Sequence, residues 1–253
     1  MGVGPTMGAV AAKASRWLSR RLLPRELRIT PGRAPVLSMT YDDVIGSACD
    51  TGAALLQTYG GRGTFYVAGS LTGGQEDGKA AHTAGQLHDL CRAGHEIASH
   101  GWAHQDYTHL RAEAIRADLD RNSRFLATFT GRTAANFAYP FGRYNLTSQL
   151  QCVLRFRSCR VVGGGVYRHH VDLNCLGSLR LYGDELASSA WRRALQQIAD
   201  GGWLVVNTHA VEEDCGPYGC RPDDLDALLR YARELGCELL PVEDAINAWQ
   251  RER

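Results

Sequence analysis

The chain has 253 residues, of which 44% are hydrophobic and 22% are charged, with 28 lysines and arginines against 27 aspartates and glutamates. This composition is typical of one globular α/β domain, and it excludes an intrinsically disordered protein. The net charge of +1 argues against nucleic acid as the main partner, and no run approaches the roughly 18 apolar residues of a membrane-spanning helix.

The first 33 residues form a basic N-terminal extension, which we expect to be helical and to precede a main domain over residues 34–253. They hold seven lysines and arginines against Glu26 alone, a net charge of +6. Trp17, Leu18 and Leu22 would form the apolar face of an amphipathic helix. Such a helix either packs on the main domain, which we favour, or makes weak peripheral contact with an anionic membrane surface. The basic residues follow the first apolar stretch, unlike in a secretory signal, so a cytoplasmic location is expected.

Strand and helix patterns alternate along the rest of the chain. Because strands alternate with helices, we expect an α/β fold with a parallel sheet covered by helices, and about seven strands in a single domain favour a closed or nearly closed barrel. Strands are predicted over 35–41, 63–67, 95–98, 136–139, 158–162, 176–181, 202–208 and 237–240. Helices are predicted over 47–59, 83–93, 110–129, 146–156, 186–200, 222–235 and 242–249.

Four of the predicted strands end in residues that can carry chemistry. In α/β barrels the active site lies at the carboxyl ends of the strands, so these four segments are expected to face one mouth. The first strand ends in Asp42 and Asp43, the third is followed by His100 and His104, the fourth runs into Tyr139-Pro-Phe-Gly142, and the strand over 202–208 is followed by His209.

The spacing of His100 and His104 allows both imidazoles to reach one cation, although a pair of this kind alone is a weak signal. Adjacent carboxylates diverge at a strand end, so one of Asp42 and Asp43 can bind the metal while the other acts on the attacking water. Two histidines and one carboxylate fit both zinc hydrolases and non-haem iron oxygenases. The second carboxylate and His209, as a base and an acid, favour hydrolysis of an amide or ester.

Four motifs together resemble those of the polysaccharide deacetylase family, also called the NodB-homology family or carbohydrate esterase family 4. Thr40-Tyr-Asp-Asp43 resembles T-F-D-D, and Ser99-His-Gly-Trp-Ala-His104 resembles H-[ST]-x-x-H. Phe137-Ala-Tyr-Pro-Phe-Gly142 is similar to R-x-P-Y, and Val206-Asn-Thr-His209 resembles L-x-x-H. The motifs occur in the family's order, and the ordered set is more specific than any one of them.

The resemblance implies a distorted (β/α) barrel that uses a divalent metal, most often zinc, to remove N-acetyl groups from an amino sugar in a saccharide or glycoconjugate. It implies that Asp43, His100 and His104 hold the metal, that Asp42 is the general base and that His209 is the general acid. It also assigns oxyanion and substrate contacts to the segment around the backbone N–H of Phe141, which includes Tyr139 and Pro140.

The sequence departs from the family pattern in three respects. Ala138 stands where the third motif often has the arginine that orients the base, and Arg180, on a different predicted strand, is our candidate to replace it. Gly101 replaces the usual serine or threonine, and no aspartate can be assigned to support His209. Alternatives are therefore an O-acetyl esterase or small-amide hydrolase on the same site, or a non-catalytic carbohydrate-binding relative.

The eight cysteines are scattered and include no C-x-x-C pair. In a chain of this length free buried thiols are the expected state. Cys215 and Cys220 bracket a predicted loop, where a small disulfide is an alternative.

Overall fold

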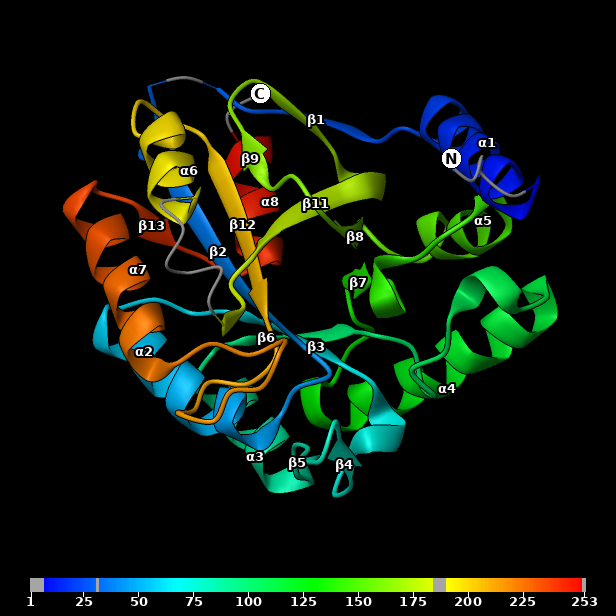
Figure 1. Ribbon diagram of the computed structural model, residues 1–253, viewed down its shortest axis with the longest axis horizontal. Helices are drawn as coiled ribbons and strands as arrows, with labels where there is room; N and C mark the ends of the chain where they lie inside the picture. The colour runs from blue at the N-terminus through cyan, green and yellow to red at the C-terminus, as the bar shows by residue number, and fades with distance from the viewer. Residues whose placement is uncertain (1–6, 31, 184–189, 252–253) are drawn as a thin grey trace, which may run out of the picture.

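Seven parallel strands close into a barrel in the computed structural model, which describes residues 7–30, 32–183 and 190–251 (Figure 1). Strands β2 and β12 pair from Val36 opposite Trp203 to Tyr41 opposite Thr208, and this pairing closes the ring. The predicted α/β barrel is therefore confirmed. In spatial order the seven strands are β2 (Val36–Asp42), β3 (Thr64–Val67), β6 (Glu96–Ser99), β7 (Asn136–Ala138), β8 (Ser158–Val162), β11 (Leu176–Arg180) and β12 (Trp203–Thr208).

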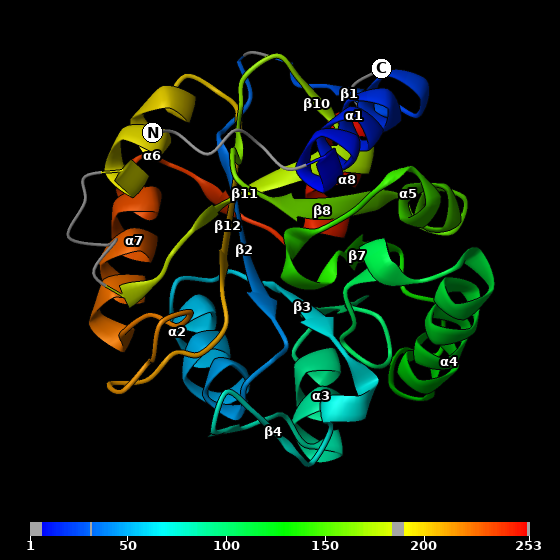
Figure 2. The same ribbon diagram turned by 45° about the vertical axis from the view of Figure 1, so that its right-hand side comes forward.

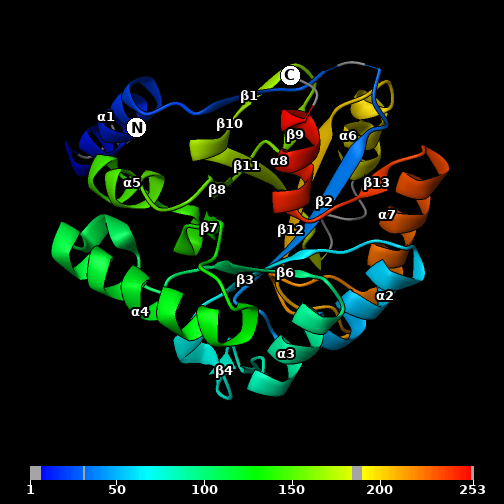
Figure 3. The same ribbon diagram turned by 180° about the vertical axis from the view of Figure 1, so that it is seen from behind.

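Helices surround the barrel and close one of its ends (Figures 1 and 3). They are α2 (Ala53–Thr58), α3 (Ala84–Arg92), α4 (Ala112–Thr130), α5 (Leu146–Val153), α6 (Ala190–Ile198), α7 (Pro222–Glu234) and α8 (Val242–Gln250). A π-helical turn, η1 (Ala48–Gly52), leads into α2. Short 3-10 turns are η2 (Gly69–Leu71), η3 (Tyr107–His109), η4 (Pro140–Gly142) and η5 (Leu173–Cys175). Residues 186–189 of the helix predicted over 186–200 lie outside the described residues.

Several very short strands lie outside the ring. The eighth predicted strand is β13 (Glu238–Leu239), which pairs with β2 beside the barrel. Strand β9 (Val166–Tyr167) pairs antiparallel with β12. Two antiparallel ribbons join β1 (Glu26–Arg28) to β10 (His170–Asp172) and β4 (Gln75–Glu76) to β5 (Lys79–Ala80). Strands of two or three residues are too short to show an alternating pattern, so the sequence did not reveal the ribbons.

The basic extension packs on the barrel. Helix α1 (Met7–Leu22) lies against α5, where Ser15 Oγ accepts a hydrogen bond from the backbone N–H of Leu146 at 3.0 Å. Arg20 Nε donates to the Tyr144 hydroxyl at 2.8 Å, and Arg25 donates to backbone carbonyls at the end of α5. No helix among the described residues has the length and apolar character needed to cross a bilayer. All eight cysteines are free thiols, including Cys215 and Cys220.

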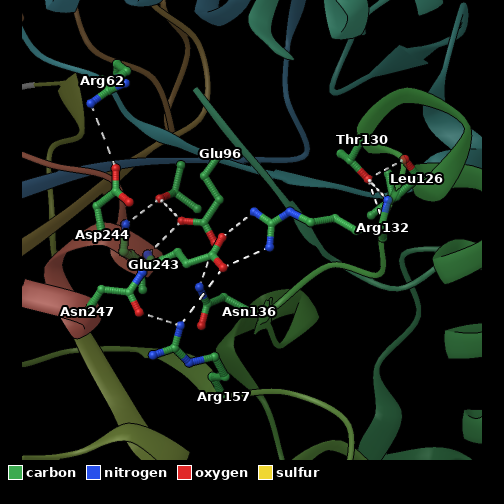
Figure 4. Close-up of polar contacts among 12 residues, drawn as sticks. Arg62, Glu96, Leu126, Thr130, Arg132, Asn136, Arg157, Glu243, Asp244 and Asn247 are labelled. Atoms are coloured by element: carbon green, nitrogen blue, oxygen red, sulfur yellow. Dashed lines mark hydrogen bonds and ion pairs between the residues drawn. The ribbon is translucent and has the colours of Figure 1, made fainter. Parts of the chain in front are cut away.

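A buried carboxylate joins α8 to the amino-terminal end of the barrel. Glu96, at the start of β6, accepts hydrogen bonds from Thr64 Oγ1 at 2.8 Å, from Asn136 Nδ2 at 2.6 Å and from the backbone N–H of Glu243 at 3.0 Å (Figure 4). Burial raises the pKa of Glu96, and the three hydrogen bonds oppose this shift. The Glu243 side chain in turn binds Arg132. This network fixes α8 across the end of the barrel opposite the catalytic motifs.

We expect Glu96→Ala to lower the free energy of unfolding by about 3 kcal/mol, because two buried donors and one half-buried donor lose their acceptor. Glu96→Gln keeps one carbonyl acceptor, and its loss should be smaller. Urea unfolding followed by tryptophan fluorescence measures both. The matched control is Glu113→Ala, which removes an exposed helical carboxylate paired with Arg116. Equal midpoints for Glu96→Ala and Glu113→Ala would contradict the role given to Glu96.

Candidate metal and catalytic site

Strand β2 ends in a strained turn that separates two adjacent carboxylates. Asp43 and Val44 both have positive φ, 59° and 62°, and the Val44 N–H donates to the Asp42 carbonyl at 2.5 Å. A β-branched residue rarely adopts this conformation. The fully buried His82 stabilises the turn, because its backbone N–H and its Nδ1 both donate to the Val44 carbonyl at 2.9 Å. Burial lowers the pKa of His82, which keeps its imidazole neutral.

Asp43 lies between two imidazoles. Its Oδ1 is 3.3 Å from His100 Nε2 and 2.9 Å from His104 Nε2. His100 Nδ1 donates to the Ala138 carbonyl at 2.8 Å, and His104 Nδ1 faces Glu76 Oε1 at 3.2 Å. Because a carbonyl and a carboxylate only accept hydrogen bonds, both Nδ1 atoms carry protons. In the neutral tautomer, therefore, both Nε2 lone pairs point toward Asp43.

This arrangement fits a divalent cation. Within the described part of the chain, one ligand atom from each of Asp43, His100 and His104 lies within 4.8 Å of the others. Asp43 Oδ1 is buried and has no hydrogen-bond donor. Burial disfavours the carboxylate, but His100 and His104 in their protonated form outweigh burial and hold the pKa of Asp43 well below its usual range. Two neutral imidazoles and one carboxylate with open positions are a ligand set that suits zinc.

The turn that carries the two histidines is fixed by Asp118 of α4. Its carboxylate accepts hydrogen bonds from the backbone N–H groups of Trp102 and Ala103 at 2.7 and 3.0 Å, and from the Tyr107 hydroxyl at 2.6 Å. A Cβ on Gly101 would lie 2.6 Å from that hydroxyl and 2.9 Å from Asp118 Oδ2, and Gly101 has φ +77°. Asp118 and Tyr107 therefore occupy the space that a serine or threonine side chain would need.

Asp42 forms a buried ion pair with Arg160 of β8. This corrects our expectation that Arg180 replaces the missing arginine, because Arg180 is exposed and lies at the rim of the pocket. Ala138 and Arg160 are register partners on β7 and β8. Side chains at paired positions point to the same face of a sheet. The small Ala138 side chain leaves room there, and the guanidinium reaches Asp42 from the neighbouring strand.

His209 follows β12 and faces the same ligand cluster. Its Nδ1 donates to the Tyr218 carbonyl at 3.1 Å, and its Nε2 lies 3.6 Å from Asp43 Oδ2. The backbone carbonyl thus orients the ring, which is the role for which the sequence offered no aspartate. Nε2 is left facing the cluster, where it can hold or release a proton.

These groups share one open pocket of about 410 Å³. Asp42, Asp43, His100, His104 and His209 all line it, so the predicted catalytic and metal-binding side chains converge. Further lining residues are Phe141, Arg143, Arg180, Tyr182 and Tyr218.

The third motif contributes one side chain to the pocket. Phe141 is 57% exposed, has φ 58°, and its ring centroid lies 4.7 Å from that of His104. Tyr139 and Pro140 are buried, and neither lines the pocket. Of the segment expected to contact substrate, Tyr139 and Pro140 thus do not reach this pocket, because Tyr139 packs against Phe137 and Tyr144 in the core. The exposed aromatic rings at the mouth belong instead to Phe141 and Tyr218.

Comparison with known proteins gives a family for this arrangement. The family model described as polysaccharide deacetylase matches residues 30–153, which include the first three motifs. The match spans 124 of the 253 residues, and over this part the chain is similar to the polysaccharide deacetylase family. No curated protein matches it.

Solved structures share the fold. The Xyl-CE4 domain of a multidomain xylanase from the hindgut metagenome of Trinervitermes trinervoides has a TM-score of 0.59 and 17% identity, over 85% of this chain and 91% of that domain. The peptidoglycan deacetylase PdaC from Bacillus subtilis has a TM-score of 0.57 and 14% identity, over 88% of this chain and 95% of that one. A CE4 family pseudoenzyme from Bacillus anthracis has a TM-score of 0.56 and 14% identity, over 87% of this chain and 68% of that one. Identities this low establish the fold alone.

Four residues around the site were not found from the sequence, because they lie outside the four motifs and no sequence pattern marks them. Each contacts a motif residue, or in one case the residue that follows the first motif, from a distant element. Arg160 binds Asp42, Asp118 fixes the histidine turn, Glu76 binds His104, and His82 binds Val44.

We expect Arg160→Ala to slow deacetylation about 10–100-fold, because Asp42 loses the group that orients it. The double variant Arg160→Ala/Ala138→Arg should recover part of the rate, since both positions share one face. Zinc binding should change little in either variant. The matched control is Arg180→Ala, for which we expect an unchanged kcat. A loss of kcat in Arg180→Ala as large as that in Arg160→Ala would contradict the assignment of Arg160.

Glu76→Gln should weaken zinc binding about 10–100-fold, because the carboxylate that fixes the His104 tautomer is lost. Isothermal titration calorimetry with zinc measures this affinity. Asp77→Asn is the matched control, since Asp77 lines the same pocket and its replacement removes the same charge. If both variants lost affinity equally, the effect would come from the negative charge of the pocket rather than from the contact with His104.

Proposed function

We propose that this protein is a metal-dependent deacetylase that removes N-acetyl groups from an amino sugar in a saccharide or glycoconjugate. The observation that carries the proposal is the convergence of Asp42 and His209 on one pocket with the Asp43, His100 and His104 cluster. A carboxylate and an imidazole beside a cation site supply the base and acid that amide hydrolysis needs. The match of residues 30–153 to the polysaccharide deacetylase model supports the same reaction class.

The roles of the residues follow from their surroundings. A divalent ion held by Asp43, His100 and His104, most often zinc in this family, would polarise the acetyl carbonyl and acidify water at the site. Asp42, which Arg160 holds in place, accepts the proton of the attacking water. His209, with Nδ1 bound to the Tyr218 carbonyl, presents Nε2 to protonate the departing amine. The backbone N–H of Phe141 is the proposed donor to the oxyanion.

The residues that line the pocket suit a sugar ring as the substrate. Arg143 and Arg180 at its rim and the aromatic rings of Phe141, Tyr182 and Tyr218 provide polar and stacking contacts for a sugar ring. Its openness to solvent through the exposed Phe141 and Tyr218 suits a group attached to a larger molecule. The cytoplasmic location expected from the sequence stays a prediction.

The test is acetate release from N-acetylglucosamine oligomers by the zinc-loaded protein, with and without a chelator. We expect Asp42→Asn to abolish turnover while zinc stays bound, because Asp42 is not a ligand. His100→Ala should lose both zinc and activity. Retained activity in Asp42→Asn would exclude Asp42 as the base.

A substrate panel separates the alternatives. O-acetylated sugars and small amides are assayed beside the N-acetylated oligomers, at matched concentrations. A preference for either class would replace the N-deacetylase proposal. No release from any substrate by protein that binds zinc would identify a non-catalytic relative.

A further inference from the structure

Exposed apolar side chains gather on α1 and α5. Among the described residues, seven large hydrophobic side chains are exposed, and two of these, Phe141 and Tyr218, belong to the pocket. Helices α1 and α5 contact each other and lie side by side in Figures 1 and 2. The other five residues lie on these helices or at the end of α5 and are called here the α1–α5 surface: Trp17, Leu18, Leu22, Leu150 and Leu154.

Five of the seven exposed side chains thus belong to two helices that contact each other, whereas apolar residues on soluble proteins are usually exposed singly. Trp17 is 61% exposed, Leu22 is 60% exposed and Leu154 is 85% exposed. By contrast, Trp191, Trp203 and Trp249 are all buried. Clustered apolar side chains of this kind mark sites of interaction with a protein or a membrane.

The same region is strongly basic. Residues 14–28 contain five arginines against Glu26 alone, a net charge of +4 in a chain whose net charge is +1. Arg16 and Arg21 are exposed beside the apolar side chains, and the Arg21 guanidinium lies 5.3 Å from the centre of the Trp17 ring. The occupant of this surface must therefore accept apolar side chains and also carry negative charge.

We propose that the α1–α5 surface binds the surface of an anionic membrane. Tryptophan and leucine can enter the boundary between headgroups and acyl chains while arginines contact the phosphates. A symmetric contact with a second copy of the chain would place Arg16 and Arg21 against their own counterparts, and like charges disfavour that contact.

The structure presents α1 already folded. Its Ser19 is buried, and the hydrogen bonds of Ser15 and Arg20 attach the helix to the segment 144–146. Lipid binding then does not have to supply the free energy for helix formation, which weakens many interfacial peptides. Tyr144, the partner of Arg20, directly follows Arg143 at the rim of the pocket. Helix α1 is thus joined by one hydrogen bond to the residue next to Arg143 in the pocket.

Sedimentation of the full-length protein with phosphatidylcholine vesicles, with and without phosphatidylglycerol, tests this proposal. We expect binding only to the anionic vesicles, reversal by high salt, and a blue shift of tryptophan emission as Trp17 leaves water. Arg16→Gln/Arg21→Gln should weaken binding roughly 30-fold, because each basic residue near an anionic surface raises the affinity roughly fivefold. Trp17→Ser/Leu22→Ser should weaken binding and remove the blue shift.

The matched control is Arg230→Gln/Arg251→Gln, which removes two exposed arginines from α7 and the end of α8. It should bind anionic vesicles like the unmodified protein. Thermal unfolding of every variant shows whether it is folded. The proposal is overturned if the protein stays in the supernatant, if both vesicle types bind it equally, if the control loses as much binding as Arg16→Gln/Arg21→Gln, or if the α1–α5 surface instead mediates a dimer.

Discussion

The turn at the end of β2 is the constraint on which the site depends. It directs two consecutive carboxylates to different partners, Asp43 to the imidazoles of His100 and His104 and Asp42 to Arg160. Two consecutive residues with positive φ cost about 1–3 kcal/mol each. The surrounding fold supplies this free energy, because Val44 is buried in the core and His82 binds its carbonyl twice. If the strand continued in extended conformation, Asp42 and Asp43 would point to opposite faces of the sheet. Asp42 would then no longer lie beside the ligand cluster.

The sequence predicted the barrel and the convergence of its motifs because both follow from general rules. Strands that alternate with helices form parallel sheets, and the carboxyl ends of parallel strands meet at one end of a barrel. Asp42, Asp43, His100, His104 and His209 could therefore be placed together without coordinates. The resemblance to a family then supplied the separate roles of two adjacent carboxylates, which spacing alone left open.

The partners of these motif residues could not be predicted, because they depend on strand register and on loop contacts. Arg160 faces Asp42 only because it pairs with Ala138 across β7 and β8. A shift of that pairing by one residue would turn its side chain to the other face of the sheet. Glu76 reaches His104 from a ribbon of two-residue strands, which leaves no periodic pattern in the sequence.

The position of the arginine on β8 also explains the polar interior of the barrel next to it. Burial of a guanidinium costs less free energy when acceptors meet its donors in addition to the ion pair. Arg160 has Ser178 Oγ at 3.4 Å from Nη1, and Ser178 donates to Asn207 Oδ1 at 2.8 Å. Asn207 Nδ2 in turn donates to the Tyr182 hydroxyl at 2.8 Å, in the wall of the pocket. One chain of hydrogen bonds through β11 and β12 therefore links Arg160, the partner of the proposed base, to Tyr182 in the wall of the pocket, and this chain accounts for the polar side chains of Ser178 and Asn207 in the interior.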